Sequence, residues 1–181
     1  MKQEMDIKRQ AIGGDDSIII KKFFKGLEGG RTLHVLEDSK TVVTENKVTT
    51  TTEILYPAVL DAGTPIVKVT RTIGGQELQV YEPVAIKKVT REYSESYSLS
   101  ASKAGKTEVS ISYDVNDDGS AKEGQTYVGI LYKSILKDKA AASIMTWGVV
   151  NPAVKGYLTA GVQAKIKAAC PHIDFQIDEE A

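Results

Sequence analysis

Cysteine and histidine are nearly absent from this chain of 181 residues. Cys170 is the only cysteine, so the chain can form neither an intrachain disulfide nor a cysteine metal cluster. The two histidines, His34 and His172, do not stand in a metal-binding or catalytic spacing with each other or with a carboxylate. The sequence therefore does not support a metalloenzyme or a histidine-dependent hydrolase.

Motifs for phosphate binding and for nucleophilic catalysis are also missing. The sequence contains no nucleophile elbow, no P-loop and no strand-led glycine motif for a dinucleotide. The glycine-rich residues 26–30 lead into Arg31, Thr32 and Leu33 and not into a helical pattern. We therefore expect a protein with no catalytic residues, no cofactor and no enzymatic activity.

The chain also lacks an excess of one charge and lacks long apolar runs. It has 23 lysine and arginine residues against 24 aspartate and glutamate residues, for a formal net charge of -1. Such a balance gives no general attraction for nucleic acid or for an anionic membrane. The longest uncharged run, residues 140–154, is too short to cross a bilayer, and residues 1–6 lack the apolar part of a secretory signal. We expect no nucleic-acid partner, no membrane partner, and synthesis in a cytoplasm.

Strand-forming patterns dominate the chain from residue 41 onward. The β-branched or alternating segments are residues 41–44, 48–56, 66–73, 77–81, 84–86, 107–115 and 172–177. Gly74 and Gly75 predict a tight hairpin turn, and the two most apolar segments, residues 127–135 and 142–150, should form the centre of the core. Thr159 should cap a helix over residues 160–169, which ends before Pro171. The predicted class is mainly β (α+β) with one short C-terminal helix.

The first fifty residues differ from the rest in having little continuous apolar surface. Their prominent apolar residues are Ile18, Ile19, Ile20, Phe23, Phe24 and Leu33. Such a segment cannot bury enough apolar area to make a core by itself. We therefore predict an extended N-terminal arm over residues 1–50 that takes its order from a partner, and a β-rich domain over residues 51–181.

An acidic run resembles the first half of a calcium-binding loop. Asp114, Asn116 and Asp118 place oxygen atoms at alternate positions before Gly119. The second half does not follow the pattern, because Gln125 occupies the position of the bidentate glutamate. The alternative is an acidic hairpin turn in which asparagine and aspartate supply the turn geometry.

Aromatic residues offer two further candidates for binding. Tyr93 and Tyr97 lie close in sequence to Lys87, Lys88 and Arg91, a mixture that suits a sugar or a nucleic acid. The alternative is a pair of tyrosines on an exposed hairpin or against a neighbouring subunit. The single tryptophan, Trp147, belongs to the core or to an interface, or else forms a platform for a ligand.

Several segments stand out by the order in which they occur along the chain. They are residues 30–35, the turn Ala62-Gly63-Thr64-Pro65 within residues 57–68, the strand Tyr127-Val128-Gly129-Ile130-Leu131, residues 141–151 and residues 158–175. This order resembles that of head decoration and head-fibre proteins of tailed bacteriophages. The segments cover about half of the chain. The chain departs from the family pattern between Pro83 and Gln125, where the family has a short polar link, and we interpret residues 84–125 as an inserted hairpin.

This resemblance implies a structural protein of the virion. The implied fold is a small β-barrel or β-sandwich-like decoration domain, and the implied assembly is a homotrimer. The implied partner is the major capsid protein, bound on the outer surface of the head in a virion assembled in a bacterial cytoplasm. Ile18, Ile19, Ile20, Phe23, Phe24 and Leu33 would then be the capsid contacts. The alternative is a head-fibre base or a host-surface glycan-binding module, which would use Tyr93, Tyr97 and the inserted hairpin.

Overall fold

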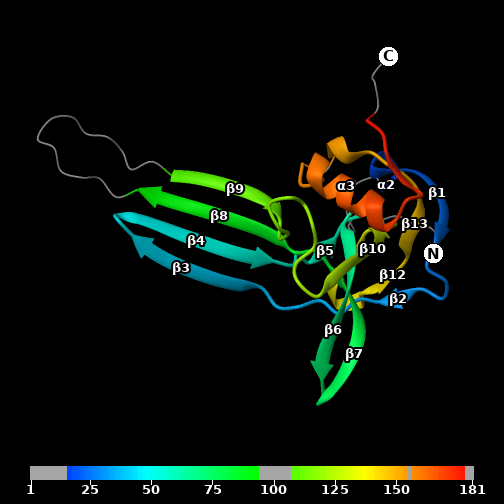
Figure 1. Cartoon of the computed structure of the whole chain (residues 1–181), viewed down its shortest axis with the longest axis horizontal. Helices are drawn as coiled ribbons and strands as arrows, with labels where there is room; N and C mark the ends of the chain where they lie inside the picture. Colours follow the sequence, from blue (N-terminus) through cyan, green and yellow to red (C-terminus); the bar gives the residue numbers. More distant parts are fainter. Residues whose placement is uncertain (1–15, 94–106, 155, 178–181) are drawn as a thin grey trace, which may run out of the picture.

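The computed structural model describes residues 16–93, 107–154 and 156–177. Most of them lie in strands, as predicted, and the strands form a six-stranded sheet and a four-stranded sheet (Figure 1). Neither sheet closes into a barrel in this part of the chain. The predicted mainly β class is therefore confirmed.

The six-stranded sheet forms the centre of the core. Its order is β1-β13-β10-β6-β7, and β14 pairs in parallel with β13. Its strands are β1 (Ile20–Gly26), β6 (Pro65–Ile73), β7 (Gln76–Pro83), β10 (Gln125–Leu131), β13 (Ile144–Val150) and β14 (Ile173–Phe175). Fully buried side chains concentrate on β10 and β13, among them Ile130, Leu131, Ile144, Met145 and Val150. This confirms the prediction that the two most apolar segments lie at the centre.

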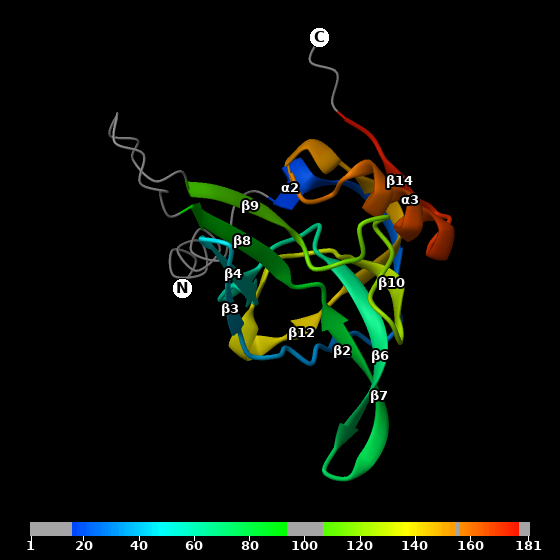
Figure 2. The ribbon, with the colours of Figure 1, turned by 60° about the vertical axis from the view of Figure 1, so that its left-hand side comes forward.

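The β6–β7 hairpin extends from the core on its own (Figures 1 and 2). Ile73 pairs with Gln76, so Gly74 and Gly75 form the predicted two-residue turn. Their φ values of 58° and 80° are in the left-handed region that this turn needs, which explains the choice of glycine at both positions.

The four-stranded sheet projects in a different direction (Figures 1 and 2). Its order is β3-β4-β8-β9, and its strands are β3 (Ser39–Glu45), β4 (Val48–Leu55), β8 (Ile86–Tyr93) and β9 (Thr107–Tyr113). The predicted inserted hairpin supplies β8 and β9, and these strands continue the β3–β4 hairpin across the β4–β8 pair. The insertion is therefore half of a larger sheet and does not stand alone.

Short elements close the core around the main sheet. They are β2 (Arg31–Thr32), β5 (Val59–Leu60), β11 (Ile135–Leu136), β12 (Ala141–Ala142), and the 3-10 turns η1 (Lys137–Lys139) and η2 (Pro152–Val154). β2 pairs with β12, and β5 pairs with β11. The Asn151 side chain caps the turn at Pro152 by accepting a hydrogen bond from the amide of Ala153.

The predicted C-terminal helix is confirmed as α3 (Ala160–Ala169). The hydroxyl of Thr159 caps its first turn by accepting from the amide of Val162, and Val162 and Ile166 bury its inner face in the core. A four-residue helix, α2 (Asp16–Ile19), was not predicted. The Asp16 carboxylate at its start accepts hydrogen bonds from the amide and hydroxyl of Ser134, which fixes this short helix to the segment after β10.

The description of residues 1–50 as an arm without a core needs correction from residue 16 onward. β1 pairs with β13 along its length, and the amide of Asn151 donates to the carbonyl of Ile19 at 2.8 Å. Residue 50 lies inside β4, so no boundary falls there. The sequence argument failed because it tested this segment as a separate unit, whereas its apolar residues complete the core of the following domain. Residues 1–15 lie outside the described part.

Candidate functional site

The structure describes the side chains of five of the six candidate contact residues, and these five separate into a buried and an exposed group. Ile19, Ile20 and Leu33 are buried in the core of this chain, so the premise that they lack a core is wrong. Phe23 and Phe24 remain exposed, at 41% and 58% of their surface. The side chain of Ile18 lies outside the described residues. Only the two phenylalanines are therefore placed as surface candidates.

Phe23 and Phe24 belong to an exposed aromatic cluster, which we call the aromatic edge. Its members are Phe23, Phe24, Tyr132, Trp147 and His172. Phe23 stacks on Tyr132 with the ring centroids 4.2 Å apart, and Trp147 lies 5.4 Å from Phe24 and 5.5 Å from His172. Trp147 is 47% exposed and thus belongs to the surface and not to the core. Four separate parts of the chain contribute to these ring contacts.

Irregular pairing at the edge of the sheet turns these rings outward. Phe23 pairs with Gly148 and Lys25 pairs with Trp147, which leaves Phe24 as the extra residue of a β-bulge. Bulges redirect a side chain and interrupt regular pairing. Gly148 makes the close approach possible, because a Cβ atom there would overlap with the carbonyl oxygen of Lys22 and the sulfur of Met145.

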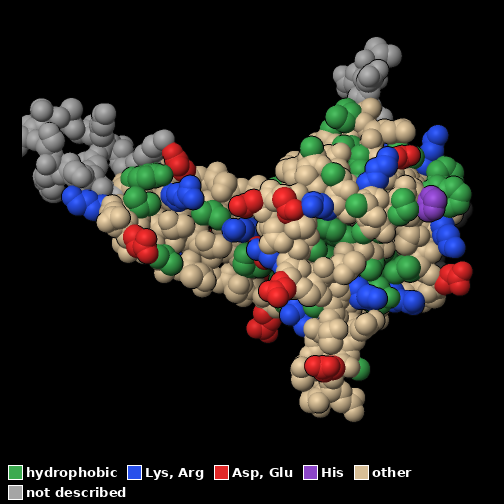
Figure 3. Space-filling model, viewed as in Figure 1, with side chains coloured by type: hydrophobic (Ala, Val, Ile, Leu, Met, Phe, Trp, Pro, Cys, Tyr) green, Lys and Arg blue, Asp and Glu red, His purple; other side chains and the backbone are tan. Residues whose placement is uncertain are grey.

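Basic side chains surround the aromatic edge. Lys21, Lys22 and Lys25 are exposed on β1, and the ammonium of Lys133 lies 5.5 Å from the centre of the Tyr132 ring. Figure 3 shows hydrophobic side chains beside Lys or Arg side chains at this end of the molecule, opposite the four-stranded sheet. The surface therefore combines exposed aromatic area with positive charge.

A buried ion network holds the β6–β7 hairpin to the segment after β2. The Glu82 side chain is 2% exposed, receives two hydrogen bonds from Arg71 at 2.9 and 2.7 Å, and lies 2.8 Å from Nδ1 of His34. Burial acts to raise the pKa of Glu82, but the hydrogen bonds from Arg71 and His34 outweigh it and lower the pKa. The Glu82 carboxylate is bonded to both Arg71 and His34, so we interpret this network as structural.

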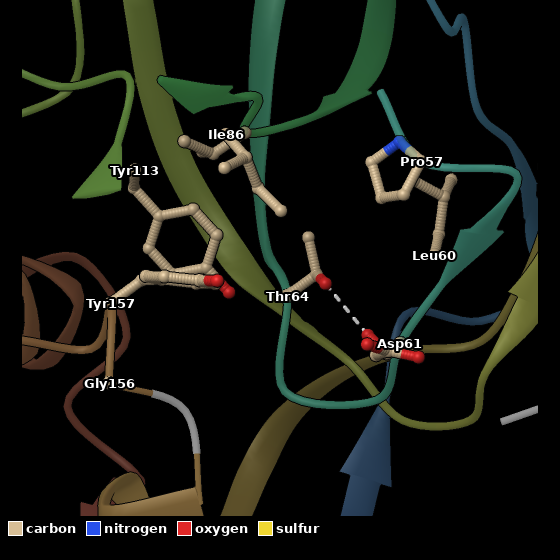
Figure 4. A pocket seen from close by; sticks show the side chains of 9 residues that line it. Pro57, Leu60, Asp61, Thr64, Ile86, Tyr113, Gly156 and Tyr157 are labelled. Atoms are coloured by element: carbon tan, nitrogen blue, oxygen red, sulfur yellow. Dashed lines mark hydrogen bonds between the residues drawn. The ribbon is translucent and has the colours of Figure 1, made fainter. Parts of the chain in front are cut away.

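A pocket of about 430 Å³ lies where the four-stranded sheet meets the core. It is lined by Pro57, Leu60, Asp61, Thr64, Val84, Ile86, Tyr113, Gly156 and Tyr157. In Figure 4 the side chains of Tyr113 and Tyr157 lie against each other, with their hydroxyl ends directed toward Thr64 and Asp61. The ring centroids are 5.5 Å apart with an interplanar angle of 74°. The pocket thus has aromatic and aliphatic walls and a few polar groups.

The Tyr113 hydroxyl at this pocket is held in its protonated form. Thr64 donates from its hydroxyl to the backbone oxygen of Asp61 at 2.7 Å. Burial raises the pKa of Tyr113 well above its usual range, and the negative charge of Asp61 raises it further. A tyrosine in this setting serves as a hydrogen-bonding and packing group and not as a base.

The residues of the candidate calcium loop are engaged with other groups. Asp114 pairs with Lys122 at 3.2 Å, and Asp118 pairs with Lys165 at 2.9 Å. The side-chain amide of Asn116 donates to the hydroxyl of Ser120 and to the backbone oxygen of Ala121. Hydrogen bonds from Ser120 and Lys165 hold the pKa of Asp118 far below its usual range. The acidic-turn interpretation fits this geometry, and the calcium interpretation stays a prediction.

Only one of the two candidate tyrosines can be placed. Tyr93 ends β8, is partly exposed, and donates from its hydroxyl to Glu108 at 3.1 Å. Tyr97 lies outside the described residues. A joint binding site of Tyr93 and Tyr97 therefore stays a prediction.

Sequence reasoning missed two features that the fold creates. His172 joins the aromatic edge because β14 pairs with β13, and Tyr132 joins it because the segment after β10 brings its ring onto Phe23 of β1. The pocket unites residues 57–64, 84–86, 113 and 156–157, which share no periodic pattern. The local signals were the consecutive pair Phe23 and Phe24 and the single tryptophan Trp147, and they identify part of the aromatic edge.

Within the described residues, no group of three or more His, Cys, Asp or Glu side chains is arranged to hold a metal ion. A search of the same residues for helices long and apolar enough to cross a membrane finds none. No protein-family model, no curated protein and no solved structure matches this chain.

Proposed function

We propose that this chain is a non-enzymatic virion protein that binds the outer surface of a tailed-phage capsid and stabilises the head. The proposal rests on the resemblance in segment order and on one structural observation, the exposed aromatic edge with its surrounding lysines. Exposed aromatic clusters on soluble proteins are typical of sites that bind another macromolecule. The partner is the major capsid protein.

The edge geometry favours binding through side chains and not through strand addition. Lysines and bulges along an edge strand hinder pairing with a further strand, and β1 has both. Phe24 and Trp147 present large apolar areas next to each other, as the central residues of interfaces do. The lysines around them suit an acidic area of the capsid surface, where they would direct encounter and orientation.

Stabilisation of the head then follows from mass action. A protein that binds only the assembled shell lowers the free energy of that shell. Many copies on a symmetric lattice multiply the effect of one modest contact. Assembly as a homotrimer, which the family resemblance implies, would add simultaneous contacts for each unit.

The test is cosedimentation of the purified protein with expanded capsids that lack it. We expect Trp147→Ala and Phe24→Ala each to weaken binding at least about tenfold, as central interface aromatics do. Val42→Ala is the matched control, because Val42 is exposed to a similar extent but lies on the four-stranded sheet. Unchanged binding of the two aromatic variants, with circular dichroism showing that they are folded, would refute this role of the aromatic edge.

A second candidate function, a head-fibre base or a glycan-binding module, is favoured by the projecting four-stranded sheet. The described part of the sheet ends at Tyr93 and Thr107, away from the core, and the exposed Tyr93 side chain lies at this end (Figure 1). A glycan array probed with the full chain distinguishes this function: specific binding lost in Tyr93→Ala supports it, and an array without signal argues against it.

A further inference from the structure

The outer edge of β9 is open to a further strand. β9 forms one border of the four-stranded sheet, and no described strand lies along its outer side (Figures 1 and 2). It pairs with β8 without a register shift and therefore has no bulge. It contains neither lysine nor proline, and its one charged residue is Glu108. Bulges, lysines and prolines are the usual devices that keep an edge strand from pairing with another chain.

Other edge strands of the two larger sheets do carry such devices. β3, on the opposite border of the same sheet, includes Lys40 and Glu45. β1 includes three lysines and several register shifts. β7 ends in Pro83 and forms a bridge from Tyr81 to Leu33. β9 differs from these three strands in having a regular edge with a single charge.

The backbone pairing shows which groups of β9 face outward. The amide of Asp114 donates to the carbonyl of Ala85, in the same register as the β8–β9 pair. Hydrogen-bonded and non-hydrogen-bonded pairs alternate along antiparallel strands, so the even-numbered residues of β9 bond to β8. The amides and carbonyls of Thr107, Val109 and Ile111 therefore point away from β8, toward a further strand.

The side chains along this edge leave apolar area in water. Val109 and Ile111 are two residues apart, so they lie on the same face of the sheet, and they are 56% and 48% exposed. Ser110 and Ser112 are exposed on the opposite face. A strand added to this edge would cover the two apolar side chains and would meet only small polar ones on the other face.

We propose that two copies of this chain pair through β9, antiparallel, with Ser110 of one copy opposite Ser110 of the other, so that two four-stranded sheets become one sheet of twice the width. In this register Val109 lies opposite Ile111 of the second copy. These two residues exchange both backbone hydrogen bonds, because the amide and carbonyl of each point outward. The inference does not depend on capsid binding, and the pairing leaves the aromatic edge free.

Charge favours this register and a second copy as the occupant. Glu108 lies opposite Ser112 of the second copy, so no like charges meet across the new pair. Lys87 pairs with Ser112, so Lys87 of the second copy lies on the same face as Glu108, one strand further, with only the small serine between them. Moving the centre to Ile111 would instead place Glu108 opposite Asp114, which is unfavourable.

A two-fold pairing of this kind is closed, because the same edge is used on both copies. One strand buries less area than a stable interface does, so we expect a reversible dimer that dissociates on dilution.

The first experiment cross-links the full-length protein through single engineered cysteines under mild oxidation. In the proposed register the two residues at position 110 form a non-hydrogen-bonded pair, with Cα atoms about 4.5 Å apart, which suits a disulfide. Ser112→Cys is the matched control, because it is exposed on the same face of the same strand but its two copies would lie about 14 Å apart. The parent protein, whose Cys170 is buried, gives the background.

We expect Ser110→Cys to form at least about ten times as much disulfide-linked dimer as Ser112→Cys. Equal yields from the two variants, or a yield from Ser110→Cys no higher than the background, would overturn the proposed register.

The second experiment is sedimentation velocity over a range of protein concentrations. Val109→Lys should weaken self-association at least about tenfold, because it places an ammonium group against Ile111 of the second copy. Val42→Lys is the control, since Val42 is 55% exposed in the same cross-strand row but lies on β3. Circular dichroism verifies that both variants fold. Undiminished association of Val109→Lys would contradict the proposal, and so would a parent chain that stays monomeric, a result that would assign this edge to a strand of another protein.

Discussion

The two sheets of this protein show how differently strands can be stabilised within one chain. The six-stranded sheet buries large apolar side chains on β10 and β13 and is covered by α3. The four-stranded sheet is rich in threonine, and β3 is exposed along its whole length, while β4 is half-buried. No second layer covers the outer part of that sheet in the described residues (Figure 1). The comparison indicates that the first sheet supplies most of the stability, whereas the second extends the chain away from the core.

The network around Glu82 and the contacts around Glu53 differ in the same way. Glu82 is buried and bonded to both Arg71 and His34. Glu53 is half-buried on β4 and pairs with Lys40 at 3.7 Å and Lys88 at 3.2 Å across the neighbouring strands. Water competes more with the second set of contacts, because the Glu53 side chain is 24% exposed and the Glu82 side chain only 2%, so charge contributes less in the projecting sheet.

The largest expected effect comes from deleting core volume. Leu131→Ala should lower the free energy of unfolding by about 3 kcal/mol, because it leaves a cavity beside β6 and β13. Val109→Ala, on the exposed face of β9, should cost about 0.5 kcal/mol or less. Urea denaturation of both variants gives the two values. Equal losses would mean that the projecting sheet is as tightly packed as the core.

A smaller effect should follow from filling the space between β1 and β13. Gly148→Ala should cost about 2 kcal/mol, because the added methyl group overlaps with the Lys22 carbonyl and with Met145. Gly75→Ala is a control at a glycine with open space around it, where the strain of its φ of 80° is the only cost. Urea denaturation gives the loss of stability of each variant, and hydrogen exchange of the β1 amides shows whether β1 is loosened. If exchange at β1 is unchanged in Gly148→Ala, β1 is not held by this close approach.

Removing the charge of Glu82 should cost about 1.5 kcal/mol at neutral pH, because Arg71 and His34 lose their shared partner. The effect should depend on pH. The folded protein holds the pKa of Glu82 below its ordinary value of 4.5, so the carboxylate stabilises the fold above that pH and loses this contribution as the pH falls below it. The difference between the parent protein and Glu82→Gln should therefore shrink on acidification. A difference that stays constant from neutral to acidic pH would contradict the network's role.

The smallest effect is expected for Glu53→Gln. The pKa of Glu53 is lowered by its hydrogen bond and charge interaction with Lys88, but both lysines that pair with it are exposed to solvent. We expect a slight loss of stability that disappears when salt is added, since salt screens exposed charges. Thermal unfolding at low and high salt measures it. A loss as large as that of Glu82→Gln, or one insensitive to salt, would remove the distinction between the two sheets.

The sequence predicted those elements whose signals are local. Gly74 and Gly75, Thr159, and the apolar runs of β10 and β13 each specify a turn, a cap or a buried strand within a few residues. It did not predict that residues 19–33 complete the core. Their apolar side chains are too few to form a core alone and are buried only when they pack with residues of β10 and β13. For the same reason it found Phe23 and Phe24 but neither the whole aromatic edge nor the pocket, whose residues are brought together by pairing between distant strands.

The most direct test of the central claim uses the single tryptophan of the chain, Trp147, which lies in the aromatic edge. Replacing it with azatryptophan gives an emission that can be separated from that of capsid tryptophans. The account predicts that this emission is quenched readily by acrylamide in the free protein and becomes protected when the protein binds expanded capsids. Protein that cosediments with capsids while its azatryptophan remains as accessible as before would contradict the account.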